Sequence, residues 1–246
     1  MIDDKTEQVL LEIFGRASGW ADGKERPGKM SPDFADLAAF AKVLSVDPDE
    51  GQLQQFLTTH PRMLLGLFGE GGDSDQAFLT KPPIGTRFNG DFAVLNVSQG
   101  GCTISLVEIE PSKEVLFTKK LTPGRRLQGA IGQVHDWAQW ISRNKQTFVR
   151  ETVDLAKRVP LYPGKAPNRS FRLWEPDHIE QAWLSFGGFD NTAIQYAIII
   201  GRWARLAEEA RQRLLFLNQK EHPGRIIYTY DQVARRSYDR PATSSF

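Results

Sequence analysis

The chain contains a single cysteine, Cys102, among 246 residues. This scarcity excludes a framework of internal disulfides and the usual cysteine-based zinc sites. The chain also lacks an excess of either sign of charge, since 31 basic and 30 acidic side chains give a net charge of +1. The overall field therefore predicts neither a nucleic-acid nor a membrane partner, and any basic surface must be local.

Long hydrophobic runs are absent as well. The longest apolar stretch, "YAIIIG", is far too short to span a bilayer, and the N-terminal segment does not place basic residues before an apolar core. We therefore expect a soluble, cytoplasmic protein with no membrane partner. With 40% hydrophobic and 25% charged residues, the composition is typical of a globular protein that buries a good core.

Hydrophobic periodicity predicts helices in the first part of the chain. Apolar residues recur at helical spacing in "TEQVLLEIFGRA" and "SPDFADLAAFAKVL", so we interpret residues 1–48 as a short N-terminal helical extension. Another helix follows, with Leu53, Phe56 and Leu57 on one face, and it ends before Pro61. Composition predicts a loop over residues 69–83.

The pattern changes after Gly85. "TRFNGDFAVLNVS" and "CTISLVEIE" predict two strands of a hairpin, and the apolar stripe of "RLQGAIGQVHDWAQWISRN" predicts a helix that lies on the sheet. A strand over 193–202, a helix over 204–220 and a strand over 225–233 are expected to follow. This order predicts an α/β fold with a mixed central sheet flanked by helices.

Three acidic residues lie near strand ends. Asp91 begins one predicted strand, and the hairpin returns the chain so that Glu108 can meet it. Glu108 and Glu110 leave the same face of their strand. Carboxylates around one point suit Mg²⁺ or Mn²⁺, although acids at strand ends are also commonly plain surface charges.

The segment after Glu110 is locally basic. It holds five basic residues against one acid, Glu114, and the basic residues are Lys113, Lys119, Lys120, Arg125 and Arg126. Such a composition suits phosphate binding. The following helix places Gln133 and Trp137 on one flank, with Trp140 beyond, so all three side chains could line the site. The alternative is core packing for the tryptophans and a solvated helix position for Gln133. Arg202 and Arg205 follow a strand and offer phosphate contacts, solvated charge or pairing between subunits.

These motifs resemble known families. Asp91, the Glu108-Ile109-Glu110 strand and Gln133-x-x-x-Trp137 resemble the motif set of PD-(D/E)xK nucleases, which have a restriction-endonuclease-like fold. More closely, "LQQFLTTHPRMLL", "VEIEPSKEVLFTKK", "AIGQVHDWAQWI", "AIIIGR" and "IIYTYDQV", in this order, resemble the Shedu family of bacterial anti-phage proteins. We place the corresponding domain at residues 49–240.

The resemblance implies a metal-dependent DNA nuclease. Asp91, Glu108 and the Ile109 carbonyl would hold Mg²⁺ or Mn²⁺. Glu110 or Lys113 would manage the attacking water, and Gln133 would steady the substrate or the site. The DNA backbone would be gripped by Lys119, Lys120, Arg125 and Arg126.

Two positions depart from the family pattern. Glu110 stands where the family has Lys, and Trp137 stands where it has Tyr. The resemblance also implies a homo-oligomer, either a dimer or a tetramer.

Two other functions stay open on the sequence alone. One is a catalytically inactive module of the same fold that binds nucleic acid or a protein partner, and the other is a scaffold or assembly subunit whose tryptophans form an interface. Metal-dependent cleavage distinguishes the nuclease from both, whereas salt-sensitive DNA binding without cleavage indicates the inactive module.

Overall fold

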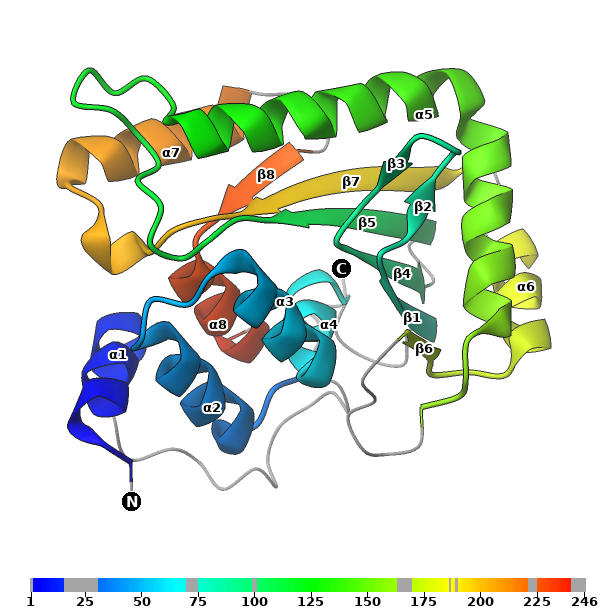
Figure 1. Ribbon diagram of the computed structural model, residues 1–246. Coiled ribbons are helices and arrows are strands. Elements are labelled where there is room, and N and C mark those ends of the chain that lie inside the picture. Colours follow the sequence, from blue (N-terminus) through cyan, green and yellow to red (C-terminus); the bar gives the residue numbers. More distant parts are fainter. Residues whose placement is uncertain are drawn as a thin grey trace.

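The centre of the molecule is a six-stranded sheet (Figure 1). The structure, a computed structural model, describes residues 2–15, 31–69, 75–98, 101–162, 170–185, 187–188, 190–220 and 225–239. The strands are β1 (Asp75–Thr80), β4 (Phe92–Ser98), β5 (Gly101–Ile109), β6 (Phe171–Arg172), β7 (Thr192–Ile199) and β8 (Arg225–Tyr228). Their order across the sheet is β6-β1-β4-β5-β7-β8.

The sheet is mixed, as the sequence predicts. β1, β4 and β5 are antiparallel neighbours, whereas β5, β7 and β8 run parallel. Each of these two parallel pairs needs a crossover connection, and both connections contain helices. α5 (Arg125–Arg158) and α6 (Pro176–Ser185) lie between β5 and β7 in the chain, and α7 (Glu208–Lys220) lies between β7 and β8.

α5 covers one face of the sheet. The predicted apolar stripe is confirmed, since Leu127, Ala130, Val134 and Ile141 are all buried in the core on this face. The sequence predicts a helix end at Asn144, but the backbone only leaves helical geometry there, with φ −130° and ψ 26°, and then continues as helix. Figure 1 shows this kink as the turn that carries the second half of α5 around the sheet.

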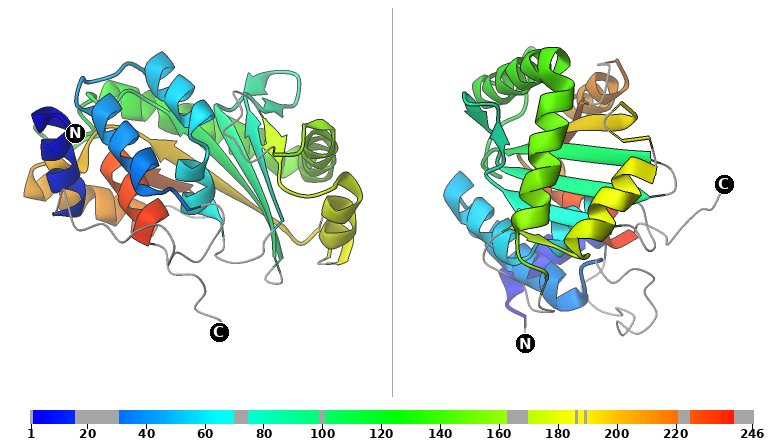
Figure 2. Two further views of the ribbon diagram at one scale, coloured as in Figure 1. Left: turned by 90° about the horizontal axis from the view of Figure 1, so that it is seen from below. Right: turned by 90° about the vertical axis from the view of Figure 1, so that its right-hand side faces the viewer.

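Five shorter helices cover the opposite face, as the side view in Figure 2 shows. They are α1 (Asp4–Phe14), α2 (Phe34–Leu44), α3 (Glu50–Thr59), α4 (Arg62–Phe68) and α8 (Tyr230–Asp239). Leu10 of α1 and Phe40 of α2 share one core with Val107 and Ile109 of β5. α3 and α4 contact the sheet directly, whereas α1 and α2 pack on the outer side of this helical layer, against one another and against α3 and α8. In the described part of the chain, no helix has the length and apolarity needed to cross a membrane.

Two predicted elements are wrong. Residues 69–83 include β1, whose residues Gln76 to Leu79 are buried on both faces, so the strand has no alternation for the sequence to display. The strand predicted over 225–233 ends at Tyr228, and α8 begins at Tyr230. The Thr229 N–H donates to Gln232 Oε1 (2.9 Å) and the Gln232 N–H donates to Thr229 Oγ1 (3.3 Å), a capping exchange that starts a helix.

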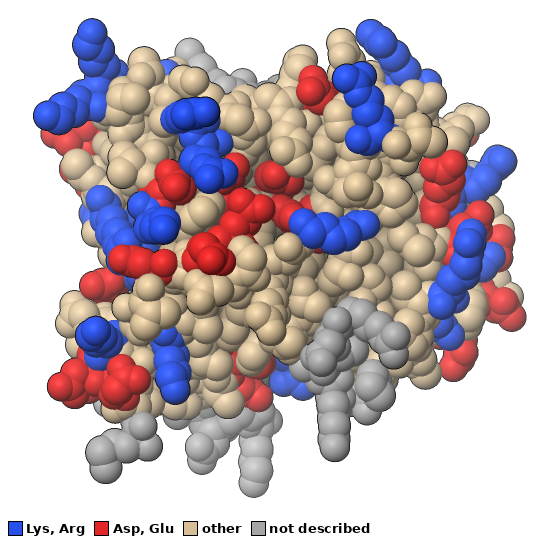
Figure 3. All heavy atoms as spheres, in the orientation of Figure 1, with Lys and Arg blue, Asp and Glu red and all other residues tan. Residues whose placement is uncertain are grey.

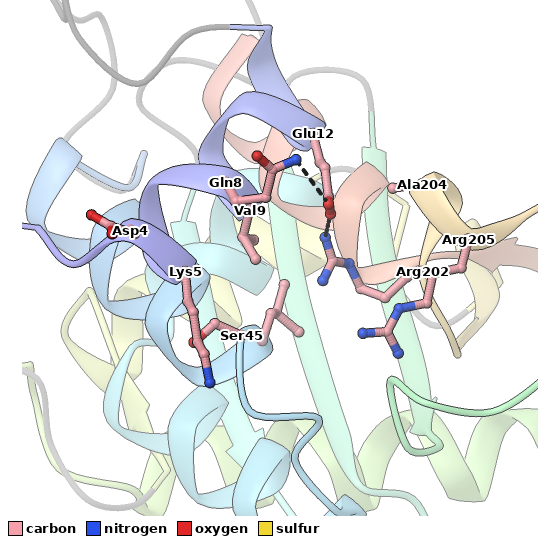
Figure 4. Close-up of a pocket in the computed structure, with 10 residues that line it drawn as sticks. Asp4, Lys5, Gln8, Val9, Glu12, Ser45, Arg202, Ala204 and Arg205 are labelled. Atoms are coloured by element: carbon pink, nitrogen blue, oxygen red, sulfur yellow. Dashed lines mark hydrogen bonds and ion pairs between the residues drawn. The ribbon is translucent and has the colours of Figure 1, made fainter.

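Arg202 ties the N-terminal helices to the sheet. Its buried guanidinium donates through Nε to both carboxylate oxygens of Asp231 (3.0 and 2.9 Å) and through Nη2 to Glu12 Oε2 (2.9 Å). Figure 4 shows Glu12 meeting Arg202 beside a cavity of about 360 Å³. Arg205 is half exposed and pairs with Asp47. Arg202 is therefore committed to buried ion pairs within the chain, whereas Arg205 forms its pair at the surface and stays exposed to solvent.

Replacing Arg202 by Met is expected to lower the free energy of unfolding by about 3 kcal/mol, because it leaves a buried carboxylate without its cation. The matched control is Arg205→Met, which removes a half-exposed pair and should cost less than about 1 kcal/mol. Urea unfolding of both variants measures the two values. Equal losses would contradict a special role for the buried pair.

Candidate active site

The register of β4 and β5 brings two acids together. Phe92 pairs with Val107, so Asp91 comes next to Glu108 at the same end of the two strands. The Asp91 N–H donates to the Val107 carbonyl (3.1 Å), which extends the ladder past the end of β4. Both carboxylates are largely buried. The structure therefore places side by side the two residues that the sequence predicts as metal ligands.

The Asp91 carboxylate is held from three directions. Its Oδ2 accepts a hydrogen bond from the Ile109 N–H (2.8 Å). Its Oδ1 contacts Lys81 Nζ (2.5 Å) and accepts from Gln54 Nε2 (3.3 Å). These partners fix the orientation of the carboxylate beside Glu108.

Glu110 follows β5 and continues its pairing to the end of β7. Its N–H donates to the Ile199 carbonyl (2.8 Å), and its own carbonyl accepts from the hydroxyl of Tyr230 (2.7 Å), a fully buried residue of α8. The Glu110 side chain pairs with Arg126 at the start of α5 (Nη1 to Oε2, 3.5 Å). Sheet, α8 and α5 thus meet at this residue.

Burial and mutual repulsion perturb these acids. Burial raises the pKa of Glu108 to about 9, with further increases from the negative charges of Asp91, Glu110 and Glu50, while Lys81 acts in the opposite direction. Burial also raises the pKa of Glu110 to about 7, against the opposing charge of Arg126. Such perturbed carboxyls in one cluster are characteristic of functional sites.

Glu50 and Gln54 bring α3 into this cluster. Glu50 is close enough for its charge to raise the pKa of both Glu108 and Glu110, and Gln54 hydrogen bonds to Asp91. α3 reaches the acids because Leu53 and Leu57 of the same helix are buried against the sheet. The sequence patterns did not single out Glu50, Gln54 or Lys81. Glu50 and Gln54 lie one helical turn apart, and this spacing is a weak sequence signal that both face the same site.

The basic segment forms a loop that buried residues anchor to the core. Leu116 and Phe117 are buried, and Phe117 bridges to Pro123. Between them the tight turn exposes Lys119 and Lys120, and Arg125 and Arg126 are exposed in the first turn of α5. Figure 3 shows acidic side chains in a band between α5 and the N-terminal helices, with lysines and arginines around it.

The other predicted site residues are either exposed on the surface or packed in the core. Lys113 and Gln133 are exposed, and within the described residues neither makes a hydrogen bond or ion pair to Asp91, Glu108 or Glu110. Trp137 is fully buried in the core between α5 and the sheet. Trp140 packs against Gly85, between β2 (Pro83–Ile84) and β3 (Phe88–Asn89). The tryptophans therefore pack in the core, which is one of the two roles predicted for them.

The donor chemistry fits a divalent cation. Two buried carboxylates lie side by side, and their repulsion is relieved by a cation that prefers oxygen ligands, such as Mg²⁺ or Mn²⁺. In the described ranges, no three His, Cys, Asp or Glu side chains are already grouped as a set of metal ligands. Whether the Ile109 carbonyl is a ligand stays a prediction.

Without divalent ions, the protein should lose stability as the pH rises. The folded-state pKa of Glu108 lies above the ordinary 4.5, at about 9, so its contribution is complete at low pH and disappears as the pH rises through this value. Between about pH 6 and pH 9 the parent should lose on the order of 2 kcal/mol more than Glu108→Gln, whose amide has no proton to release. Urea unfolding in EDTA at both pH values measures the difference, and parallel losses would contradict it.

A protein-family model matches most of the chain. The family model described as "Shedu protein SduA, C-terminal" matches residues 47–233, which include Asp91, Glu108, the basic loop and β7 to β8. No curated protein matches the chain. The matched region covers most of the sequence, and its family is one associated with anti-phage defence. The chain therefore belongs to the Shedu family, through the C-terminal domain of SduA.

Proposed function

We propose that the protein is a Mg²⁺-dependent DNA nuclease that hydrolyses phosphodiester bonds in anti-phage defence. The observation that carries this proposal is the buried pair of Asp91 and Glu108, which the chain follows with four exposed basic residues that we call the basic rim: Lys119, Lys120, Arg125 and Arg126. Arg126 connects this rim to the acids through its ion pair with Glu110. Buried acids suit a hard cation, and the basic rim suits the phosphates of a nucleic-acid backbone. The restriction-endonuclease-like fold is part of the same proposal.

Asp91, Glu108 and the Ile109 carbonyl would hold the ion. When bound, the ion lowers the pKa of water and offsets negative charge on the phosphate under attack. Asp91 is kept in place by the Ile109 N–H, so its carboxylate is preorganised for this task.

Glu110 is the candidate for proton transfer. With a pKa raised to about 7, its carboxyl can accept a proton from the attacking water near neutral pH. The water oxygen forms a bond to phosphorus, one ester P–O bond breaks, and the leaving oxygen takes up a proton. One water is consumed, and a phosphate monoester and a hydroxyl are produced.

The basic residues would position the DNA. Lys119 and Lys120 stand at the tip of the loop, and Arg125 lies at the start of α5. Arg126 would contact the DNA backbone and also pairs with Glu110. These contacts read no sequence directly, because phosphate contacts position a duplex and base contacts specify it.

One observation favours a second candidate, a binding module without catalysis. Glu110 adds a third acid where the resemblance leads one to expect a lysine, and Lys113 makes no contact that would bring its ammonium back to the acids within the described residues. Such a module would keep the basic rim and bind DNA without cutting it.

One experiment distinguishes the nuclease from the binding module. Purified protein is incubated with linear and circular DNA, with Mg²⁺, with Mn²⁺ or with EDTA, and with RNA in parallel. We expect divalent-dependent cleavage of DNA. Salt-sensitive DNA binding with no cleavage under any ion would contradict the nuclease and support the binding module.

A further inference from the structure

Lys81 is bound to Asp91 at two points. It follows β1 in a left-handed backbone conformation, with φ 48°, and its N–H donates to the Asp91 carbonyl (2.9 Å). Its ammonium contacts Asp91 Oδ1 (2.5 Å). A positive φ is unfavourable for a residue with a side chain, and here the strained conformation directs a cation into the acid cluster.

The burial of the two partners is very unequal. The Lys81 side chain is 54% exposed, whereas that of Asp91 is 6% exposed. The ammonium therefore sits at the mouth of the site, with buried carboxylates on one side and solvent on the other. A phosphate group approaching the acids from solvent meets Lys81 at this point.

The contact with Asp91 is also replaceable. Lysine carries its charge on a flexible stem, so the ammonium can leave one oxygen for another at small cost. A divalent cation binding to Asp91 would compete for the same Oδ1 atom. Gln54, the other group on this oxygen, is neutral and hydrogen bonds more weakly, at 3.3 Å.

We propose that Lys81 is the phosphate-binding cation of this site: it occupies Asp91 in the ion-free protein, and it moves to a non-bridging oxygen of the scissile phosphate when a divalent ion takes Asp91 Oδ1. This proposal rests on the proposed nuclease function. It assigns Lys81 to direct contact with substrate, which makes it a catalytic residue. As a competitor for Asp91, Lys81 should weaken ion binding. As a ligand of the phosphate, it should speed cleavage.

The test uses Lys81→Met, which keeps the stem and removes the charge. Calorimetric titration with Mn²⁺ should show binding at least about threefold tighter, because a competing cation is gone. Single-turnover cleavage at saturating Mg²⁺ should be at least about tenfold slower, because a group that stabilises charge on the phosphate is gone. Lys81→Arg should retain most of the rate, and the double variant Lys81→Met/Glu110→Lys should recover part of it.

Lys157→Met is the matched control. Lys157 also pairs with a carboxylate, Glu180 Oε2 at 2.6 Å, but between α5 and α6. This variant should keep the Mn²⁺ affinity and the cleavage rate of the parent.

Two results for Lys81→Met would overturn the proposal: unchanged Mn²⁺ affinity, or weaker Mn²⁺ binding together with slower cleavage, which indicates a structural role. If the parent itself never cleaves, the nuclease function fails separately. The Mn²⁺ titration and the DNA affinity in Mn²⁺ then decide the role of Lys81. Tighter ion binding with weaker DNA binding supports the proposal, and no change in either overturns it.

Discussion

Glu108→Gln is expected to reduce DNA cleavage at least about a hundredfold, equivalent to about 2.7 kcal/mol of lost transition-state stabilisation. Asp91→Asn should have an effect of the same size. Each change removes one of the two buried carboxyl groups that would hold the cation, while the amide keeps the size of the carboxyl. Single-turnover cleavage at saturating Mg²⁺ measures the loss.

The same variants should keep their fold and their DNA binding. The amide at 108 replaces a carboxyl whose pKa is raised to about 9, so the ion-free variant should be at least as stable as the parent at neutral pH. Glu180→Gln, an exposed acid of α6 that pairs with Lys157, is the matched control and should cleave like the parent. Full activity in both Asp91→Asn and Glu108→Gln would refute the assignment of the ion site.

The second large effect concerns the basic rim. Changing Lys119, Lys120, Arg125 and Arg126 together to Gln should weaken DNA binding on the order of a hundredfold at moderate salt. The slope of log K against log[salt] should become shallower by about 0.9 for each phosphate that the variant no longer neutralises. Fluorescence anisotropy over a series of salt concentrations measures both quantities.

Two comparisons isolate the role of charge in that result. Leu116 and Phe117 anchor the loop from inside the core, so the surface changes should leave its fold intact. A triple variant that retains Arg126 keeps the partner of Glu110 and separates DNA binding from the chemistry of the acids. A salt slope equal to that of the parent would mean that the loop is simply solvated.

Local patterns sufficed for much of the fold. The β4–β5 hairpin and the apolar stripe of α5 follow from alternation and helical spacing, and both are observed. β1 was missed because Gln76 and Ala77 are both buried, so its two faces look alike in the sequence. The start of α8 was missed because "RIIYTYDQV" is strand-like until the capping exchange of Thr229 and Gln232 is considered.

The candidate site, like the fold, has residues that the sequence could predict and residues that it could not. Asp91 and Glu108 are connected by a short hairpin, so sequence spacing alone was enough to place them together. Gln54, Lys81 and Tyr230 reach the acids from three other elements, which only the packed fold brings near. Arg202 appeared to be a surface charge because its partners, Glu12 and Asp231, are far away in the sequence.

The position of a bound divalent ion tests the proposed metal site most directly. Crystals of the protein soaked in Mn²⁺, at a concentration that supports cleavage, can be examined by anomalous diffraction at the manganese edge. We expect a peak between the carboxylates of Asp91 and Glu108, with the Lys81 ammonium displaced from Asp91 Oδ1. A peak elsewhere, or no peak at these carboxylates under conditions in which DNA is cut, would contradict the metal site.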